Sequence, residues 1–163
     1  MTKRSIAVTA MTAAALLLAA RPASADITAF VGLATAPAGN RPARGVGVGF
    51  GFLVVGFEAE YLTAAEDVED ASPSFRVGSF NGMLQTPVEM ARTQFYVTAG
   101  GGLYRERLGA FQETHVAVNT GGGAKIRLAG PLRLRVDYRL FRLSGEPLVQ
   151  RAHRLYVGLN LAF

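Results

Sequence analysis

Three groups of residues have types that could bind phosphate or metal ions, but their spacing does not fit that chemistry. Residues 121–125 read GGGAK, whereas a phosphate-binding loop needs glycine directly before its lysine and a helix after it. The acidic run 66–70 (EDVED) is better explained as a solvated loop than as a divalent-cation site. Extending the side-chain alternation of the strands assigned below turns His115 inward and His153 outward, so the two do not easily share a metal. The sequence therefore predicts no cofactor, no metal site and no catalytic residue.

Ion pairing is the chemistry that the remaining charged residues support. In residues 132–141 arginines and one aspartate alternate with leucine, valine and tyrosine, and in residues 56–61 two glutamates alternate with aromatic residues and alanine. Alternate residues share one face of a strand, and a charge on a buried face needs a partner because an unpaired buried charge costs several kcal/mol. We therefore predict an interior ion network of Glu58, Glu60, Lys125, Arg127, Arg133, Arg135, Asp137 and Arg139.

Strands must position these charges, because apolar residues recur at every second position and no helical period occurs beyond Asp26. The alternation predicts eight strands, at residues 27–35, 45–53, 55–63, 75–84, 95–105, 116–128, 132–143 and 154–163. Their lengths fit a tilted membrane crossing, which needs about 9–11 residues.

The joints between these strands alternate in length, which is typical of an up-and-down barrel with short turns at one end and longer loops at the other. Longer joints are expected at 36–44, 64–74, 106–115 and 144–153. Tight joints are expected at position 54 and at 129–131, and the joint 85–94 is intermediate. We therefore predict an all-β fold, an eight-stranded antiparallel up-and-down transmembrane β-barrel with both ends of the chain on one side.

The charged face distinguishes this barrel from a soluble one, which would hold apolar residues inside and charges in water. Glycines at the inward positions 45, 47, 49 and 51 leave room for long arginine side chains. Outward aromatic residues are expected to form girdles at the two membrane interfaces, with Phe52, Phe57, Phe95 and Phe163 at one end and Tyr61 and Phe75 at the other.

The beginning of the chain has the pattern of a secretory signal peptide. Lys3 and Arg4 supply positive charge, residues 6–20 are apolar, and residues 23–25 (ASA) form a small-residue cleavage site. We predict a signal peptide over residues 1–25, cleaved after Ala25, and one barrel domain over residues 26–163. With no cysteine, the mature chain is expected to be neither disulfide-stapled nor acylated on cysteine.

The net charge of +5 does not favour nucleic-acid binding. Three basic residues lie in the predicted signal peptide, which leaves 14 basic against 12 acidic residues in the mature chain. The basic residues also form no continuous run. No nucleic-acid partner is expected, and no feature of the sequence indicates an oligomeric state.

The last strand ends on an aromatic residue with apolar residues at every second position before it: Val157, Leu159, Leu161 and Phe163. This ending resembles the C-terminal assembly signal of outer-membrane barrels. With the signal peptide and eight strands, the mature chain resembles the small outer-membrane barrel superfamily that includes the transmembrane domain of OmpA, OmpX and the opacity proteins. The resemblance implies an outer-membrane location, contact with the barrel-assembly machinery during biogenesis, and a filled, ion-paired lumen.

Three classes of function are compatible with this architecture. A structural or surface-interaction barrel is favoured. A narrow anion or solute channel would draw on the excess of inward basic residues. A lipid-modifying barrel enzyme is disfavoured, because such enzymes place a histidine and a serine two residues apart on the membrane face, and neither histidine here has that neighbour.

Four arginines at the ends of the later strands are candidate contacts to membrane lipid. Arginine suits phosphate because its planar guanidinium binds two oxygens at once. Lipopolysaccharide phosphates in the outer membrane are therefore the expected partners of Arg105, Arg107, Arg142 and Arg151.

Overall fold

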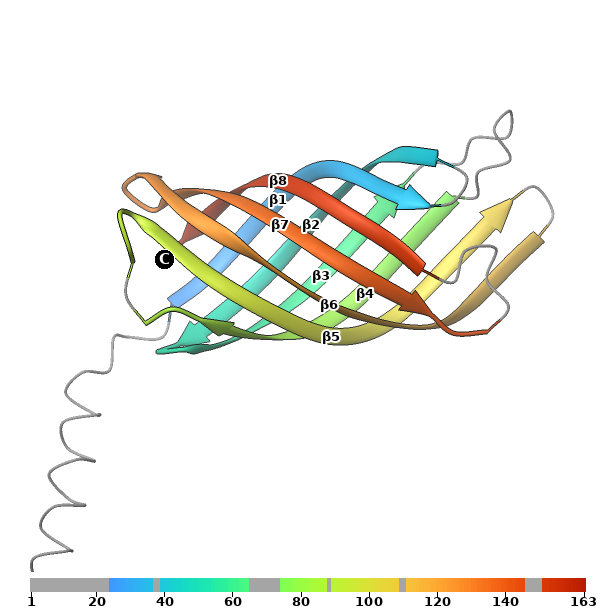
Figure 1. The fold of residues 1–163 in the computed structure, drawn as a ribbon, viewed down its shortest axis with the longest axis horizontal. Coiled ribbons are helices and arrows are strands. Elements are labelled where there is room, and N and C mark those ends of the chain that lie inside the picture. The colour runs from blue at the N-terminus through green and yellow to red at the C-terminus, as the bar shows by residue number, and fades with distance from the viewer. Residues whose placement is uncertain (1–23, 37–38, 65–73, 88, 109–110, 146–150) are drawn as a thin grey trace, which may run out of the picture.

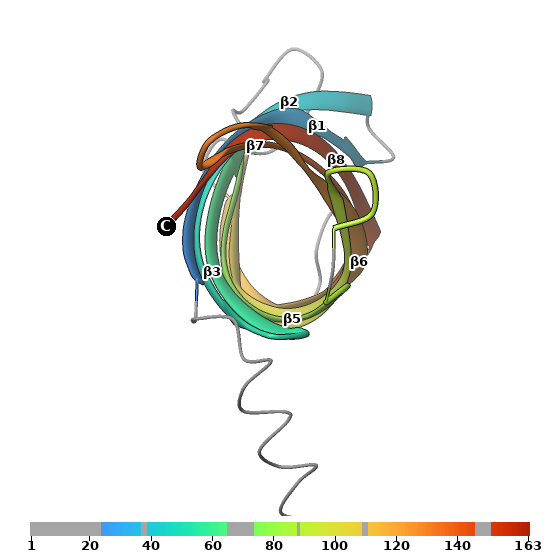
Figure 2. The same cartoon turned by 90° about the vertical axis from the view of Figure 1, so that its left-hand side faces the viewer.

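The computed structural model describes residues 24–36, 39–64, 74–87, 89–108, 111–145 and 151–163, and these form one closed barrel (Figure 1). Each strand is antiparallel to its neighbours in sequence, and β8 pairs with β1 to close the ring (Figure 2). The strands are β1 (Ser24–Ala36), β2 (Gly39–Phe52), β3 (Val55–Ala64), β4 (Ser74–Gln85), β5 (Thr93–Leu108), β6 (Phe111–Ala129), β7 (Leu132–Leu143) and β8 (Arg151–Ala162). The predicted eight-stranded antiparallel barrel is confirmed.

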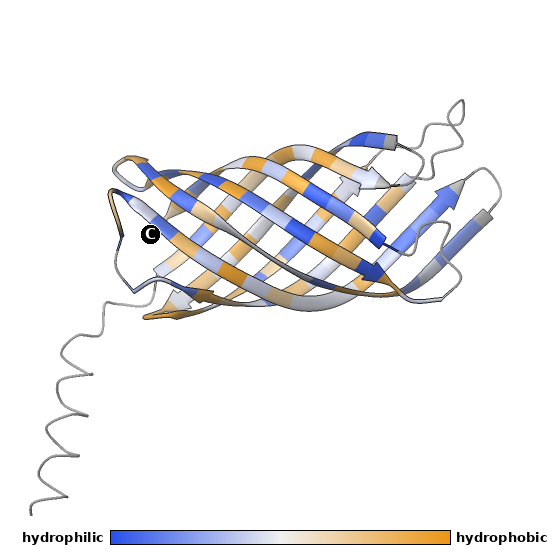
Figure 3. Ribbon diagram, viewed as in Figure 1, coloured by the Kyte–Doolittle hydropathy of each residue, from blue (hydrophilic) through white to orange (hydrophobic). Residues whose placement is uncertain are grey.

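Alternation of side chains decides which residues line the interior. In β3 exposed and buried residues alternate at every position, with Glu58, Glu60 and Leu62 buried and Phe57 and Tyr61 exposed. Hydropathy alternates along the other strands as well (Figure 3). An exposed surface of leucine, valine and phenylalanine of this extent does not suit water, where apolar patches are limited to a few hundred Å². It suits lipid. The described residues include no helix that could cross a membrane.

Both ends of the barrel chain lie at one end of the barrel, which we call the terminal end; the opposite end is the loop end (Figure 1). At the terminal end the turns are short. Leu53 and Gly130 adopt positive φ angles of 56° and 53° in the β2–β3 and β6–β7 turns. The β4–β5 connection closes in a tight turn in which Met90 and Thr93 exchange both backbone hydrogen bonds.

Two of the predicted long joints at the loop end are wrong. β1 and β2 stay in register up to Ala36 and Gly39, and β5 and β6 stay in register up to Leu108 and Phe111. Pro42 favoured a loop, but it lies where β2 pairs only with β1, since pairing with β3 begins at Ala43. A strand edge tolerates proline because no neighbour needs its missing N–H. The segments 65–73 and 146–150, in the other two predicted long joints, lie outside the described residues.

The interior has two regions along the barrel axis. Charged and polar residues fill the part nearer the terminal end, and the part nearer the loop end is mainly apolar but also holds the buried Glu106. The apolar region, which we call the apolar plug, contains Phe30, Leu62, Phe75, Val77, Tyr104, Phe141, Leu143 and Tyr156 together with small residues. The prediction that Phe75 belongs to an outward girdle is wrong, because parity along β4 turns it inward, where it is only 6% exposed.

Candidate functional site

The centre of the barrel holds a cluster of buried charges from three strands. Glu58 of β3 accepts hydrogen bonds from Arg135 and, at 2.6 Å, from Arg139 Nη2, both of β7. Arg139 Nη2 also lies 3.4 Å from Glu60 Oε2, and its Nε donates to Asp137 Oδ1 at 3.0 Å. In an eight-stranded ring β3 and β7 are four strands apart in either direction, so these ion pairs cross the lumen.

Arg154 of β8 completes this cluster, and the sequence prediction missed it. It forms a two-pronged ion pair with Glu60 and approaches Asp137 Oδ1 at 3.4 Å. Its position had a usable signal: with Val157 and Leu159 assigned outward, parity along the last strand turns Arg154 inward. We call these six residues the central network: Glu58, Glu60, Arg135, Asp137, Arg139 and Arg154.

The central network has equal numbers of carboxylates and guanidinium groups, three of each, and none of its members is more than 6% exposed. Polar neighbours satisfy further atoms: Tyr96 donates its hydroxyl proton to Asp137 Oδ2 at 2.5 Å, and Arg135 Nε donates to Tyr96 at 2.7 Å. A buried ion pair offsets its desolvation cost only with good geometry and such additional hydrogen bonds. The network is therefore a neutral, cross-linked filling and not a line of free charges.

Inward glycines leave space for these long side chains. A Cβ at Gly121 would come within 2.9 Å of Arg139 Cγ, and one at Gly47 would lie 3.4 Å from Glu58 Oε2. The GGGAK segment thus packs against the network with its glycines, and its lysine has a different partner.

That lysine belongs to a second layer of ion pairs nearer the terminal end. Lys125 Nζ lies 2.5 Å from Asp26 Oδ2. Arg127 Nη2 lies 2.5 Å from Glu89 Oε1, which is 3.8 Å from Arg133 Nη2. The structure therefore pairs Lys125, Arg127 and Arg133 of the predicted network with Asp26 and Glu89, in a layer separate from Glu58 and Glu60.

Asp26 and Glu89 were missed for different reasons. Asp26 directly follows the predicted cleavage site, where no strand partner could be read from the sequence. Glu89 lies in the β4–β5 connection, outside any alternating pattern. The irregular pairing between Arg127 and Ala129 at the end of β6 further shifts the register there.

The apolar plug closes the central network from the loop end. The Arg154 guanidinium lies 5.1 Å from the ring centre of Phe30, 5.3 Å from that of Phe141 and 4.7 Å from that of Tyr156. Phe30 and Tyr156 stack with ring centres 4.1 Å apart. On the loop-end side of these rings, a cavity lined by residues that include Ala64, Phe75 and Leu143 has a volume of only about 10 Å³. That is barely room for one water molecule.

The four arginines predicted to contact lipid do face outward, but they form two groups. Arg105 and Arg107 lie on β5, whereas Arg142 of β7 and Arg151 of β8 are direct partners elsewhere on the barrel. All four side chains are exposed.

The residues of the predicted assembly signal, Val157, Leu159, Leu161 and Phe163, also face outward and are 46%, 54%, 45% and 66% exposed.

The two histidines lie apart. His115 approaches Glu113 at 3.3 Å, while the exposed His153 shares a 2.7 Å hydrogen bond between its Nδ1 and the Tyr138 hydroxyl. Within the described part of the chain no group of three histidine, cysteine, aspartate or glutamate residues could hold a metal ion.

β1 begins at Ser24, and residues 1–23 lie outside the described residues, so cleavage after Ala25 stays a prediction.

No protein-family model matches the sequence, and no curated protein matches it either. Solved structures do match. The N-terminal β-barrel domain of Pseudomonas aeruginosa OprF is 14% identical with a TM-score of 0.69, over 86% of this chain and 97% of that one. Neisserial surface protein A is 15% identical with a TM-score of 0.65, over 88% and 99%. Ail of Yersinia pestis is 12% identical with a TM-score of 0.54, over 86% and 97%. The chain therefore has the fold of the small eight-stranded outer-membrane β-barrels.

Proposed function

We propose that this protein is an outer-membrane barrel that does not conduct solutes and that acts as a structural or surface-interaction element through its outer surface. The observation that carries this proposal is the filled interior, in which a neutral network of six buried charges is closed by the apolar plug. Eight-stranded barrels are just wide enough for side chains to fill.

A channel for anions would need a continuous basic path, and the interior gives little support for one. The inward basic excess is confined to the terminal end, where Lys125, Arg127 and Arg133 face Asp26 and Glu89. Above that level the guanidinium groups are matched by carboxylates, and the plug contributes aromatic rings and aliphatic side chains. A permeating ion would have to displace both.

Conductance in a planar lipid bilayer tests this proposal. The folded wild-type protein should show no stable unit conductance for either cations or anions. Glu58→Gln keeps the side-chain shape while removing one central charge, and it should remain closed because the plug is intact. A steady, anion-selective conductance of the wild-type protein would overturn the proposal and favour the channel.

The outer-membrane location is part of the proposal and has its own test. It is supported by the apolar exterior, by the barrel fold and by the resemblance of the last strand to an assembly signal. Folded barrels of this kind resist detergent and migrate differently on gels before and after boiling. The protein should therefore appear in the outer-membrane fraction as a heat-modifiable band, and recovery in the periplasmic fraction would contradict the location.

A further inference from the structure

Three outward arginines lie in one row across neighbouring strands. Arg44 of β2 is the direct partner of Thr63 on β3, which partners Arg76 on β4, which partners Arg105 on β5. Arg107 lies two residues further along β5 toward the loop end and partners Ser74. We call Arg44, Arg76, Arg105 and Arg107 the arginine groove.

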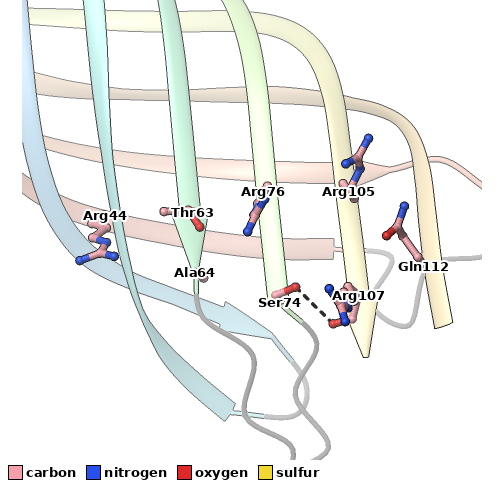
Figure 4. Close-up of a pocket in the computed structure, with 8 residues that line it drawn as sticks. All are labelled: Arg44, Thr63, Ala64, Ser74, Arg76, Arg105, Arg107 and Gln112. Carbon is pink, nitrogen blue, oxygen red and sulfur yellow. Dashed lines mark hydrogen bonds between the residues drawn. The ribbon is translucent and has the colours of Figure 1, made fainter. Parts of the chain in front are cut away.

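These four side chains line one depression on the outside of the barrel, with a volume of about 420 Å³ (Figure 4). Thr63, Ser74 and Gln112 add hydroxyl and amide groups to its lining, and Ala64 completes it. Arg105 Nε donates to the hydroxyl of Thr114 at 3.2 Å, and the Ser74 hydroxyl donates to the Arg107 carbonyl oxygen at 3.3 Å. The depression thus offers hydrogen-bond donors from five adjacent strands.

Two of these four arginines are direct cross-strand neighbours of like charge. Arg76 and Arg105 are direct cross-strand partners, so their Cα atoms are about 5 Å apart, and like charges at such positions repel. Among the described residues, neither Arg44 nor Arg76 has a carboxylate within ion-pair distance. A bound anion would replace this repulsion with attraction.

The surface next to the arginine groove is apolar. Two residues closer to the terminal end on the same strands, Val46, Tyr61, Gly78 and Leu103 face outward as mutual register partners. Val46, Tyr61 and Leu103 are 54%, 49% and 60% exposed, and a Cβ at Gly78 would meet nothing within 4 Å. The arginines therefore lie where the outer surface changes from apolar to polar, which is the level of lipid headgroups in a membrane barrel.

We propose that the arginine groove binds the headgroup of a membrane lipid that carries more than one phosphate. From β2 to β5 it spans three strand spacings, roughly 14 Å, which is more than a single phosphate can contact. Arginine forks bind phosphate oxygens in pairs, and the apolar row beside them would contact the acyl chains of the same lipid. Arg44 and Arg76 are thus added to the predicted lipid contacts, while Arg142 and Arg151 are not part of this site.

The proposal rests on the membrane location proposed above, and lipid retention tests it directly. The full protein would be purified from phosphatidylcholine nanodiscs doped with bis-phosphorylated lipid A or with the same lipid lacking both phosphates. Wild-type protein should retain the phosphorylated form at least about tenfold better, as expected for more than one charge-assisted contact. Arg76→Gln combined with Arg105→Gln should abolish the preference. Arg142→Gln combined with Arg151→Gln is the matched control and should keep it.

Several outcomes would overturn the proposal. Equal retention of the two lipids by the wild-type protein would do so without any variant, and so would an unchanged preference in the Arg76 and Arg105 double variant. Binding of inorganic pyrophosphate as tightly as the lipid would show a site for free phosphate, and binding of heparin without a lipid preference would show a polysaccharide site. None of these results alters conductance, so they are distinguishable from a failure of the closed-barrel function.

Folding of the variants has its own readout. Because the groove lies on the outside, heat-modifiable migration of the double variant should match the wild-type protein. In nanodiscs without anionic lipid the double variant should be at least as resistant to unfolding, since the repulsion between two arginines is gone. Only the wild-type protein should gain resistance when the phosphorylated lipid is added.

Discussion

Removing Glu58 should destabilise the barrel more than removing Glu58 and Arg135 together. Glu58 accepts hydrogen bonds from Arg135 and Arg139, so Glu58→Ala leaves three buried guanidinium groups against two carboxylates. Loss of one partner of a buried ion pair costs about 3–5 kcal/mol. Arg135→Ala on the same background returns the network to two charges of each sign, with Arg139 still held by Glu60 and Asp137.

The expected difference between the double variant and the two single variants is the coupling energy between Glu58 and Arg135. Residues that share one network have coupling energies of about 0.5–3 kcal/mol, and full burial with two hydrogen bonds favours the upper half of that range. The double variant should therefore lose less free energy of unfolding than the sum of the two single losses. It should also be more stable than Glu58→Ala alone.

Urea unfolding in nanodiscs measures these free energies, followed by circular dichroism because the chain contains no tryptophan. Glu58→Ala combined with Arg44→Ala serves as the control, since Arg44 lies on the outside of the barrel and should be additive within about 0.5 kcal/mol. If the double variant of Glu58 and Arg135 lost as much unfolding free energy as the sum of the two single variants, the two residues would not stabilise one another. The ion network would then not be what fills the barrel.

Three further predictions concern the outer surface, the chain end and the plug. Val136→Arg on the outward face of β7 should cost about 2–4 kcal/mol of unfolding free energy, against roughly 0–1 kcal/mol for Thr35→Arg at the loop end, and equal costs would contradict the assigned membrane level. Deletion of Phe163 should lower outer-membrane recovery in cell fractions while Phe163→Tyr should not, and normal recovery after deletion would remove its role in assembly. Phe141→Ala should cost about 3–5 kcal/mol and raise bilayer conductance, because it opens the plug; an unchanged conductance would show that the ion network alone closes the lumen.

The faces of the strands could be predicted from the sequence because side-chain parity is a local property. Two residues along a strand always share a face, so the alternation of charged and apolar residues was enough to turn Glu58 and Arg135 inward. The same rule applied to the last strand would have included Arg154. Phe75 was assigned outward because its aromatic type suited a girdle, although parity within β4 requires the opposite.

Partners across the barrel could not be predicted, because they depend on the tilt and stagger of all eight strands together. Arg133 and Arg135 are two residues apart on one face of β7, yet Arg133 lies near Glu89 while Arg135 binds Glu58. The arginine groove was missed for the same reason. Arg44 and Arg76 are unremarkable within their own strands, and only the pairing register places them in line with Arg105.

Register also links the closed interior to the outer arginine groove. Arg76 and Arg105 face outward only because they occupy the opposite parity from Phe75, Tyr104 and the other inward residues of β4 and β5. A slip of one residue would exchange every side chain between the two faces. On β4 and β5 such a slip would carry the arginines into the apolar plug, and on β7 it would expose the central charges to lipid. Burying the arginines in the plug or exposing the central charges to lipid would each cost several kcal/mol of folding free energy. The charges that fill the lumen and those that face the headgroups therefore specify the same strand register.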